Sequence, residues 1–583
     1  MNLELIADRW IIMEPFTKFL FVFMPLAAVI FPIVRNILVK TGKSLKIWVI
    51  CSFIPLILCG VHLILNWCGS NTYLILDIFW ALYVAAVFFP LMTPLCRKKA
   101  AFHIVSVICA VVVCTGTLFS FVLLGSLHAR IVNFSRMSMV DSYHALIAEM
   151  KHYYPLNEWK QIDYDAIDAE LLPMAEKAQQ TEDYFLYSEM LERLVYLTYD
   201  GHFGAFLTDS DKGLEDYIIR HMQYNYGMIV YPVSDGTVRA FMVEEGSEAQ
   251  KAGIAVGTVI TAWNGKPILT AIKETANTNI LYSNYPVQEN EDFIRPLILS
   301  VSSGEKIEVG FLDAGGNEKT VSITGKEEYF TRLNQAIDRL LHIHYNEVPE
   351  DVDGLENFRT KMLTDKVGYM RVAQEVHDTF LDAKSYVLGN YPEIQEIVRN
   401  RLNELKSRGM EKLVLDLRGN LGGNPYISTA IASMFTDKNT FAFVYGGTAD
   451  HRMNMKVEMN GEGTFKDLPV VVLVNMTCGS SGDYLADMMG KYDDHAKVVG
   501  MTTSMNIGQA VGVKCMLPGN CLVAFPVIHS LEENGDYAID TKPDRKNRVS
   551  FDEKIPVTLE LATALFDGQG DPELDAAAAM FDE

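Results

Sequence analysis

The stretch Asn475-Met-Thr-Cys-Gly-Ser480-Ser-Gly-Asp483 decides how this chain is interpreted. It places a turn of small residues between an apolar strand, residues 469–474, and a helical run, residues 484–489. A strand, a sharp turn and a helix expose a serine hydroxyl beside the unpaired amides of a helix N-terminus, which is one way to present a nucleophile. Because Ser-Ser-Gly is also ordinary turn chemistry, the pattern needs support from the rest of the sequence.

A second strand-turn-helix unit lies upstream and reads Lys412-Leu-Val-Leu-Asp-Leu-Arg418-Gly-Asn420-Leu-Gly422-Gly423-Asn424-Pro425. Its glycines let the backbone approach a ligand without a Cβ in the way, so this turn is a candidate oxyanion hole. The two stretches, in this order, resemble the tail-specific (C-terminal processing) serine peptidases. That family pairs an Asp-Leu-Arg-x-Asn-x-Gly-Gly turn with a Thr-x-x-Ser-Ser-Gly-Glu-like nucleophile turn, and Asp483 here replaces the glutamate.

A third segment supports the resemblance: Tyr226-Gly227-Met228-Ile229, followed by a Gly-rich region up to Asn264-Gly265. It is similar to a PDZ domain, a module that adds an extended peptide to a sheet edge and captures its C-terminal carboxylate. The resemblance implies that Tyr226, Gly227, Met228 and Ile229 bind the substrate. The alternative is a generic β-rich module with Asn-Gly and Gly turns.

Four apolar runs fill the first 125 residues, and each approaches the roughly 20 residues that cross a bilayer core: 19–39, 47–67, 74–95 and 101–124. A cleaved signal peptide has a single short apolar stretch, so the four runs exclude one. Basic residues gather in the first and third connecting loops, which the positive-inside rule places in the cytoplasm. The sequence thus predicts a multi-pass protein of the cell membrane, in contact with the lipid bilayer, whose N-terminus and peptidase domain are extracytoplasmic.

The expected fold class is multi-domain: a four-helix transmembrane region, a helical cap, a PDZ-like β-rich domain and an α/β peptidase core of the ClpP/crotonase-like kind. Strands that alternate with helices in the core predict a largely parallel sheet, with catalytic turns at the carboxyl ends of its strands. The expected segments are the following: N-terminal segment 1–18, transmembrane region 19–125, helical part 136–220, PDZ-like domain 226–325, peptidase core 330–560 and acidic tail 567–583.

The composition excludes some partners. A formal net charge of −23 over 583 residues argues against nucleic acid as a partner. His342 and His344 alternate, but no third ligand with suitable spacing follows, so neither a metal nor an organic cofactor is expected. Cys515 and Cys521 flank a Pro-Gly-Asn turn and are candidates for a disulfide, whereas Cys478 is expected to pack beneath the nucleophile turn.

The base that activates Ser480 needs separate identification. The lysine used by the Ser-Lys members of the family would fall near Asn506, where this chain has no lysine. The tricorn-core branch instead uses a histidine just before its PDZ domain, and His202 occupies that place. An imidazole with a pKa near 6.5 accepts a hydroxyl proton at physiological pH. The resemblance therefore implies Ser480 as nucleophile and His202 as general base, with an oxyanion hole formed by Gly422, Gly423 and Ser481.

The third catalytic residue is left open between Asp540 and Asp536, since the stretch that should supply it contains both. The predicted function is a membrane-anchored serine endopeptidase that hydrolyses extracytoplasmic proteins or peptides through an acyl-enzyme and recognises a polypeptide substrate, in one reading by its C-terminus. The alternative is a catalytically impaired member that acts as a membrane-bound PDZ-type peptide-binding or scaffold protein, as the absent lysine, Gly201 and Asp483 suggest. No oligomeric state is predicted.

Overall fold

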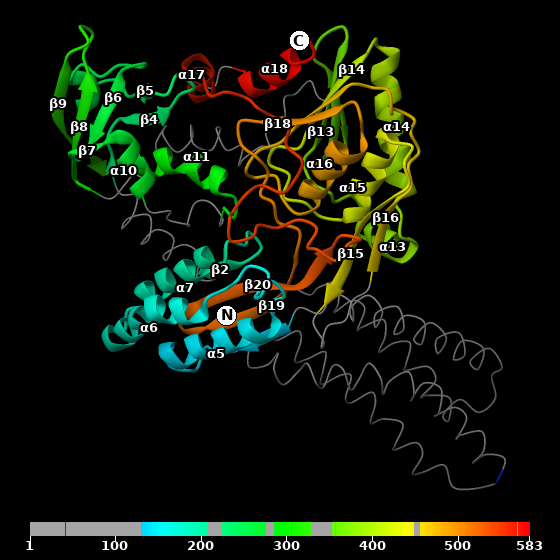
Figure 1. Cartoon of the computed structure of the whole chain (residues 1–583), viewed down its shortest axis with the longest axis horizontal. Helices are drawn as coiled ribbons and strands as arrows, with labels where there is room; N and C mark the ends of the chain where they lie inside the picture. Colours follow the sequence, from blue (N-terminus) through cyan, green and yellow to red (C-terminus); the bar gives the residue numbers. More distant parts are fainter. Residues whose placement is uncertain are drawn as a thin grey trace. The chain divides into compact units, whose positions relative to one another are not determined.

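The computed structural model describes residue 41 and residues 130–207, 224–275, 285–301, 304–327, 353–355, 357–447, 455–567 and 570–582. The chain forms two compact units, residues 1–146 with 512–523 and residues 147–511 with 524–583. In the first unit, β1 (Arg130–Asn133) pairs in parallel with β19 (Ala510–Leu517). Every candidate site residue lies in the second unit, many of whose elements are labelled in Figure 1.

A seven-stranded sheet with the order β11-β12-β13-β14-β17-β18-β21 forms the centre of the second unit. Its strands are β11 (Asp353–Leu355), β12 (Phe358–Met362), β13 (Val367–Val372), β14 (Lys412–Asp416), β17 (Val470–Leu473), β18 (Ala496–Gly500) and β21 (Glu553–Lys554). The strands from β13 to β21 are parallel, whereas β11 and β12 form an antiparallel edge. β17 reads Val-Val-Val-Leu because both faces of a parallel sheet are buried.

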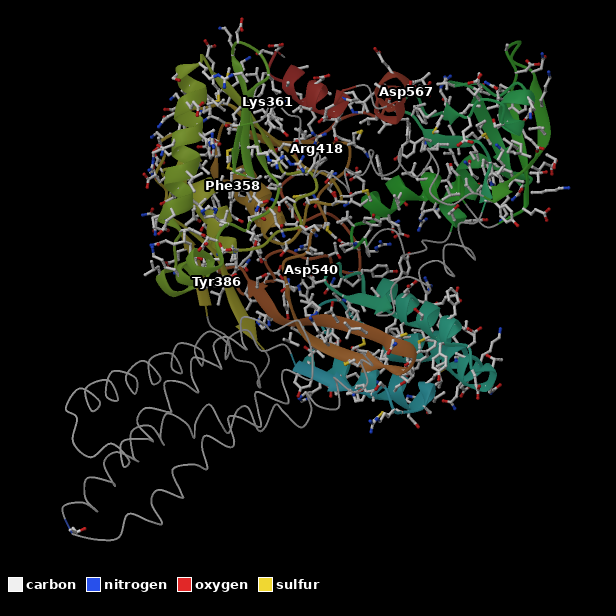
Figure 2. All side chains as sticks on the ribbon, turned by 180° about the vertical axis from the view of Figure 1, so that it is seen from behind. Phe358, Lys361, Tyr386, Arg418, Asp540 and Asp567 are labelled. Atoms are coloured by element: carbon white, nitrogen blue, oxygen red, sulfur yellow. The ribbon has the colours of Figure 1, made fainter. Side chains whose placement is uncertain are left out.

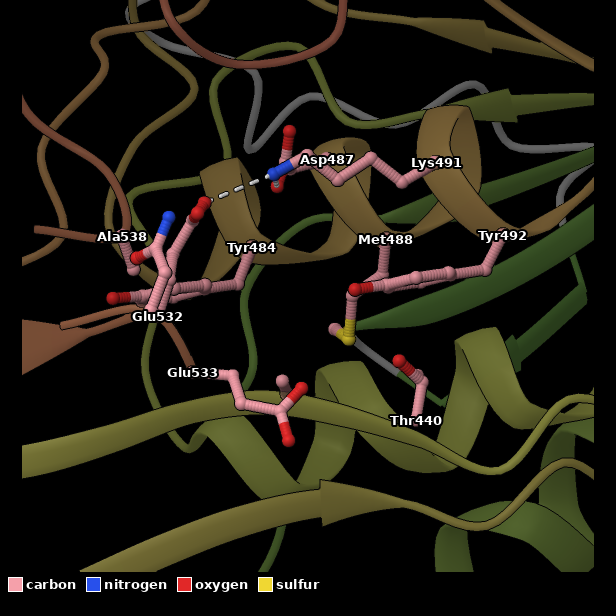
Figure 3. A pocket seen from close by; sticks show the side chains of 11 residues that line it. Thr440, Tyr484, Asp487, Met488, Lys491, Tyr492, Glu532, Glu533 and Ala538 are labelled. Atoms are coloured by element: carbon pink, nitrogen blue, oxygen red, sulfur yellow. Dashed lines mark hydrogen bonds and ion pairs between the residues drawn. The ribbon is translucent and has the colours of Figure 1, made fainter. Parts of the chain in front are cut away.

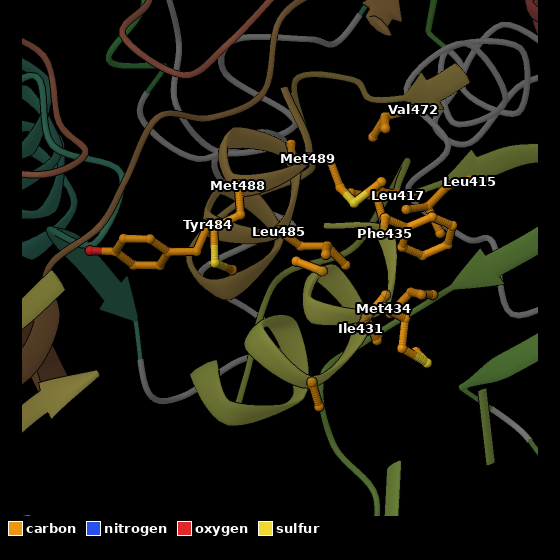
Figure 4. Packing of buried hydrophobic residues seen from close by; sticks show 14 of the residues in the cluster. Leu415, Leu417, Ile431, Met434, Phe435, Val472, Tyr484, Leu485, Met488 and Met489 are labelled. Atoms are coloured by element: carbon orange, nitrogen blue, oxygen red, sulfur yellow. The ribbon is translucent and has the colours of Figure 1, made fainter. Parts of the chain in front are cut away.

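Two hydrophobic clusters cover opposite faces of this sheet, and alternate residues of β14 divide between them. Leu413 and Leu415 belong to the cluster formed with α14 (Pro392–Ser407), α15 (Pro425–Ala432) and α16 (Ser481–Tyr492), part of which Figure 4 shows. Val414 belongs to the second cluster, which includes residues of α17 (Leu559–Asp567) and α18 (Pro572–Ala579). The parallel sheet and its flanking helices hold the carboxyl ends of β14 and β17 side by side.

A second sheet, with the order β4-β5-β6-β8-β9, forms the PDZ-like region. Its elements are β4 (Met228–Pro232), β5 (Val238–Val243), α9 (Glu248–Lys251), β6 (Val259–Trp263), β7 (Lys266–Pro267), α10 (Ile268–Glu274), α11 (Gln288–Leu299), β8 (Lys306–Leu312) and β9 (Glu318–Thr324). Its own core includes Trp263 and Phe311. The other face of β4 and β5 joins the cluster that also contains α17 and α18.

The segment before this sheet is helical, with α5 (Met139–Tyr153), α6 (Tyr164–Thr181) and α7 (Tyr184–Thr198). Asp163 and Asp183 cap α6 and α7 by accepting hydrogen bonds from backbone amides of the first turn. Tyr199, with φ 48°, ends α7 in the left-handed conformation and turns the chain toward His202.

The other described elements connect these layers. They are β2 (Gly204–Leu207), β3 (Tyr224–Asn225), β10 (Lys326–Glu327), α13 (Thr379–Leu388), η2 (Ser433–Phe435), β15 (Thr440–Gly447), β16 (Met455–Met459), η3 (Pro518–Asn520) and β20 (Cys521–Leu531). β15 pairs antiparallel with β16, and also with β20 from Val444 opposite Leu531 to Gly447 opposite Ile528.

The expected fold class is wrong in one part. Among the described residues, no helix is both long enough and apolar enough to span a membrane. The four expected spans, 19–39, 47–67, 74–95 and 101–124, lie outside the described residues. The fold that the structure supports is a mixed α/β arrangement with β-rich regions.

Two smaller expectations concern the cysteines and the C-terminal segment. Cys515 and Cys521 are both buried thiols and form no disulfide. Cys515 lies two residues before the end of β19, whereas Cys521 is the first residue of β20, so they do not stand at equivalent positions across the turn. The segment 567–583, expected to be an acidic, alanine-rich terminal helix or tail, contains α18, where Glu573 is fully buried.

Candidate active site

Ser480 occupies a strained turn between β17 and α16. Its backbone has φ 57° and ψ −120°, which a residue with a side chain adopts only under constraint from its surroundings. Its own N–H donates to Asp483 Oδ2 over 3.0 Å, and Ser481 begins the helix. The side chain of Cys478 is buried beneath the turn, and burial raises its thiol pKa well above the usual value. Within this nucleophile turn, residues 475–483, Ser480 and Thr477 are partly exposed, whereas Cys478 is buried.

Asp483, which replaces the family glutamate, fixes that turn. Besides Ser480, its carboxylate accepts hydrogen bonds from the backbone N–H groups of Asn506 at 3.0 Å and Ile507 at 2.8 Å. Burial raises the pKa of Asp483 to about 7, even though these hydrogen bonds act to lower it. The carboxylate thus ties the nucleophile turn to the segment in which the family lysine would lie.

The oxyanion turn, residues 419–424, lies directly against Ser480. A Cβ placed on Gly422 would stand 2.6 Å from Ser480 Cβ and 2.7 Å from Ser481 N, so only glycine fits there. The carbonyl oxygen of Asn420 accepts from Gly479 N–H at 2.8 Å, which joins the two turns. The Asn420 side chain also accepts the Gly422 N–H at 2.8 Å. The amide of Gly422, expected to be an oxyanion donor, is therefore already engaged.

Two other expected donors remain suitably placed. Ser481 is the first residue of α16, where a helix leaves its N–H groups without intrahelical acceptors. The carbonyl of Gly423 accepts from the Ser481 hydroxyl at 2.8 Å, so the two residues lie in contact. Gly423 is held on its other side by Glu375, whose carbonyl accepts from Asn424 N–H at 2.7 Å. The backbone amides of Ser481 and Gly423 are the best candidates for stabilising an oxyanion.

Glu375 is a functional neighbour that no motif in the sequence indicated. Its side chain is fully buried, and Oε1 accepts from Asn420 Nδ2 at 2.9 Å. Burial raises the pKa of Glu375 to about 8, which favours the protonated acid at neutral pH. Glu375 therefore positions the Asn420 side chain, which in turn accepts the hydrogen bond from Gly422 N–H.

Arg418, labelled in Figure 2, immediately precedes the oxyanion turn. Its fully buried guanidinium bonds to Asp416 at 2.8 Å, to Asp571 at 2.6 Å and to Glu573 at 3.1 Å. Burial alone would raise the pKa of Asp416, but the Arg418 charge holds it below its ordinary value. Glu573 Oε1 also accepts a hydrogen bond from Met501 N–H at 2.9 Å. Met501 directly follows β18, so this bond connects α18 to the seven-stranded sheet.

His202 lies near the nucleophile turn, to which Ile507 connects it. Among the described residues, no hydrogen bond joins the side chains of His202 and Ser480, and His202 Nδ1 is buried with no partner. Ile507 connects the two turns: a Cβ on Gly201 would lie 2.7 Å from this side chain, and one on Gly479 would lie 3.1 Å from it. Burial lowers the pKa of His202, so the imidazole is neutral at physiological pH.

A buried polar cluster supports the turn that carries His202. Asp200 Oδ1 accepts from His202 N–H at 2.9 Å, and Asp200 Oδ2 accepts from the Tyr154 hydroxyl at 2.7 Å. The ammonium of Lys160 pairs with Asp540, labelled in Figure 2, and donates to the carbonyl of Tyr199 at 2.6 Å. Sequence reasoning missed Lys160 and the side chain of Asp200, since neither stands in a motif with the other site residues.

The two candidates for the third catalytic residue have different surroundings. Asp540 is fully buried, and burial together with the Asp200 charge raises its pKa to about 7 against the effect of Lys160. Asp536 is partly exposed and accepts from Trp159 Nε1 at 2.9 Å. Only Asp540 belongs to the cluster that includes Asp200, the residue bonded to the His202 backbone.

The structure places the four expected substrate-binding residues at an edge strand, but their polar groups are engaged. Gly227 N–H donates to Asn225 Oδ1 at 2.7 Å, and the Tyr226 hydroxyl donates to the Gly304 carbonyl at 2.7 Å. Met228 and Ile229 are fully buried.

The edge of β4 beyond Ile229 is also occupied. Val230 N–H donates to Ser300 Oγ at 3.1 Å, and Pro232 has no N–H to offer. In the described conformation this edge has little capacity to pair with an added peptide strand.

In the described part of the chain, no group of three His, Cys, Asp or Glu side chains is arranged to hold a metal ion. His342 and His344 lie outside it. A cavity of about 470 Å³ beside α16 is lined by Tyr484, Lys491 and Glu532 among others (Figure 3). Neither Ser480 nor the oxyanion turn contributes to its lining, so it is separate from the candidate active site.

Comparisons with known proteins agree with this geometry. Residues 366–547 match the family model described as Peptidase family S41. A carboxyl-terminal-processing protease from Picosynechococcus sp. is 30% identical over 140 residues, which cover 24% of this chain and 29% of that protein. The chain therefore spans under a third of that relative's length.

Solved structures give weaker likenesses. Mature CPAF complexed with lactacystin is 14% identical, with a TM-score of 0.47 over 76% of this chain and 98% of the other. A photosystem II D1 C-terminal processing protease is also 14% identical, with a TM-score of 0.30 over 75% of this chain and 99% of the other.

The matched segment contains β13, β14, the oxyanion turn, the nucleophile turn and Asp540. The expected enzyme class, serine-type peptidase, is the class of the carboxyl-terminal-processing proteases in this family. The comparisons show a similarity to this family, and they do not distinguish between its branches. Residues 366–547 of this chain are thus similar to Peptidase family S41.

Proposed function

We propose that this chain is a serine endopeptidase that cleaves polypeptides through an acyl-enzyme on Ser480. The observation that carries the proposal is the contact between the two turns, where the Gly422 backbone lies against Ser480. A serine held with φ 57° at a helix N-terminus has its hydroxyl beside backbone amides before any substrate binds. Such preorganised donors stabilise a tetrahedral oxyanion without reorganisation during the reaction.

In the proposed mechanism, the Ser480 hydroxyl attacks the scissile carbonyl carbon, and His202 takes its proton. The amides of Ser481 and Gly423 hold the developing oxyanion. His202 then returns the proton to the leaving amine, and water hydrolyses the ester with His202 again as base. Burial keeps the imidazole neutral, as a base must be, and Asp200 fixes its backbone.

The proposal requires His202 to approach Ser480 when substrate binds. Catalytic hydrogen bonds often form only in the complex with substrate, and the unpaired Nδ1 of His202 is consistent with an arrangement that is completed later. Asp540, with Lys160 and Asp200, is proposed to position the turn that carries His202, in preference to the more exposed Asp536. In contrast to this part of the site, the PDZ-like edge gives little support to substrate capture by a C-terminus.

A second candidate function is a polypeptide-binding protein without hydrolytic activity. The observation in its favour is the missing bond between His202 and Ser480, together with Asn506 at the place of the family lysine. In this alternative Ser480 would keep its turn but never become acylated.

Labelling of the full chain with a fluorophosphonate probe distinguishes the two functions. The wild type is expected to be labelled, Ser480→Ala not at all, and His202→Ala at least tenfold more slowly. Asp536→Asn serves as a matched control, because it changes a partly exposed carboxylate outside the cluster. Absence of labelling in a folded wild type, repeated with peptide present, would support the binding protein.

A further inference from the structure

Seven large hydrophobic side chains are exposed among the described residues, and two of them stand at the oxyanion turn. Leu421 is 64% exposed and Val376 is 40% exposed. A single exposed leucine on a protein surface is ordinary. The exposure of Leu421 is of interest because of its position: Leu421 immediately precedes Gly422, which lies against Ser480.

Leu421 is fixed in place from both sides. The carbonyl of Asn420 accepts a hydrogen bond from Gly479 N–H, and Gly422 N–H donates one to the Asn420 side chain. The backbone on either side of Leu421 is thus hydrogen-bonded, and its side chain remains exposed at the tip of a constrained turn. The exposure is therefore built into the turn rather than a result of a loosely held loop.

Val376 is connected to the oxyanion turn through the preceding residue, Glu375, whose backbone is hydrogen-bonded to that turn. Glu375 N–H donates to the Gly422 carbonyl at 3.2 Å, and Asn424 N–H donates to the Glu375 carbonyl at 2.7 Å. The carbonyl of Val376 accepts from Asn357 Nδ2 at 2.7 Å, which restrains this residue as well. Two exposed apolar side chains thus come from segments that are hydrogen-bonded to each other next to the nucleophile.

The two turns carry no exposed charge. The oxyanion turn has no ionisable side chain, and those of the nucleophile turn, Cys478 and Asp483, are fully buried. The exposed charge nearest in sequence to Val376 is Asp378, two residues further along the chain. Glu375 is also buried, and its raised pKa favours the neutral acid. An extended polypeptide whose scissile carbonyl reaches Ser480 would therefore place an adjacent side chain near the exposed apolar side chains of Leu421 and Val376.

We propose that Leu421 and Val376 form a specificity subsite that selects substrates with an apolar side chain next to the scissile bond. This inference rests on the proposed endopeptidase function. Removing apolar surface from water on both partners favours an aliphatic or aromatic residue, whereas a charged one loses hydration without gaining a partner.

The test uses the full chain and two series of internally quenched peptides, with Leu or Phe, or with Lys or Glu, next to the cleaved bond. The variants are Leu421→Glu, Val376→Glu and the conservative Leu421→Met. Leu269→Glu is the matched control, because Leu269 is 58% exposed in the PDZ-like region. The rate of fluorophosphonate labelling is measured in parallel, so that damage to Ser480 is detected separately.

We expect Leu421→Glu and Val376→Glu each to lower kcat/KM for apolar peptides about tenfold, mainly through KM, and to improve the relative cleavage of Lys peptides. Leu421→Met and Leu269→Glu should keep the wild-type preference, and Leu269→Glu should be labelled within about twofold of wild type. An unchanged preference in both glutamate variants, with labelling intact, would overturn this inference alone. A folded wild type that is never labelled would remove the endopeptidase proposal and this inference together.

Discussion

Gly422 and Ser480 are packed so closely that a Cβ on Gly422 would lie 2.6 Å from Ser480 Cβ. Gly422, the first glycine of the Gly-Gly pair, therefore matters because it lacks a side chain, not because of its amide, which bonds to Asn420. Since Gly422 also has φ 90°, both its size and its backbone conformation require glycine.

Gly422→Ala is expected to abolish fluorophosphonate labelling, because the added methyl group displaces the nucleophile turn. Gly236→Ala is the matched control: Gly236 has φ 82°, and a Cβ there meets no atom within 4 Å. Both variants should lose about 1 kcal/mol of stability from the left-handed conformation alone. Equal labelling of the two alanine variants would show that the contact with Ser480 is unimportant.

Lys160→Met is expected to move the acid limb of the pH profile of kcat/KM to higher pH. The Lys160 charge lowers the pKa of His202, so its removal makes protonation of the imidazole easier, and the base is lost at a higher pH than in the wild type. The wild-type limb should itself lie below about 6.5, the ordinary value for histidine.

Lys542→Met provides the control for Lys160→Met, since Lys542 is 38% exposed and pairs with Asp536 at 3.7 Å. A shift of the Lys160→Met profile toward lower pH would contradict the assignment of His202 as base.

Glu375→Gln is expected to remove part of the pH dependence of stability. The folded protein keeps the Glu375 proton up to a pKa of about 8, whereas an unfolded glutamate releases it near 4.3. The contribution of Glu375 to stability is thus fully present below about pH 4.3 and is lost as pH rises toward 8, with a slope of up to about 1.4 kcal/mol per pH unit.

Thermal unfolding of wild type and Glu375→Gln at several pH values between 5 and 8 checks this prediction. Glutamine still offers an oxygen to Asn420 Nδ2, so the oxyanion turn should be preserved. The variant should gain stability relative to wild type as pH rises, and a constant difference across this range would contradict the buried, protonated Glu375.

Arg418→Met is expected to destabilise the protein by roughly 3 to 5 kcal/mol, because Asp416 and Glu573 would be left buried without their cation. Arg193→Met, which breaks an exposed pair with Glu170, should cost less than about 1 kcal/mol. Denaturant unfolding of both variants measures the difference, and similar losses would mean that α18 is not held through Arg418.

Ser300→Ala is expected to free the Val230 N–H at the edge of β4. If this bond keeps peptides out, a fluorescent peptide with a free C-terminus should bind the variant at least several-fold more tightly than the wild type, as measured by anisotropy. Ser247→Ala, at the cap of α9, is a control in the same region. Tight binding by the wild type would show that the β4 edge is open in solution.

Much of the peptidase core could be predicted from local sequence. The strand 367–372 and the helix that begins at Pro392 follow from runs of apolar residues and from helical spacing, which depend only on neighbours along the chain. The position of Ser480 between a strand and a helix follows in the same way. The resemblance to a known family added the pairing of the two turns.

The polar contacts of the site could not be predicted, because their partners are distant in sequence. Lys160 meets Asp540, and Glu375 meets Asn420, without any motif that links the members of either pair. The role of Glu573 was missed for a similar reason: a short acidic and alanine-rich segment suggests an exposed tail unless a buried arginine elsewhere requires an anion.

The sequence by itself determined the turn that carries Ser480 and its setting, since a small-residue turn between an apolar strand and an amphipathic helix specifies that geometry locally. Only the tertiary structure decided which amides are available to an oxyanion, which aspartate supports His202, and that the β4 edge is already bonded. The physical reason is that each N–H, once buried, must find an acceptor, and the acceptor present in the folded chain is set by packing rather than by spacing.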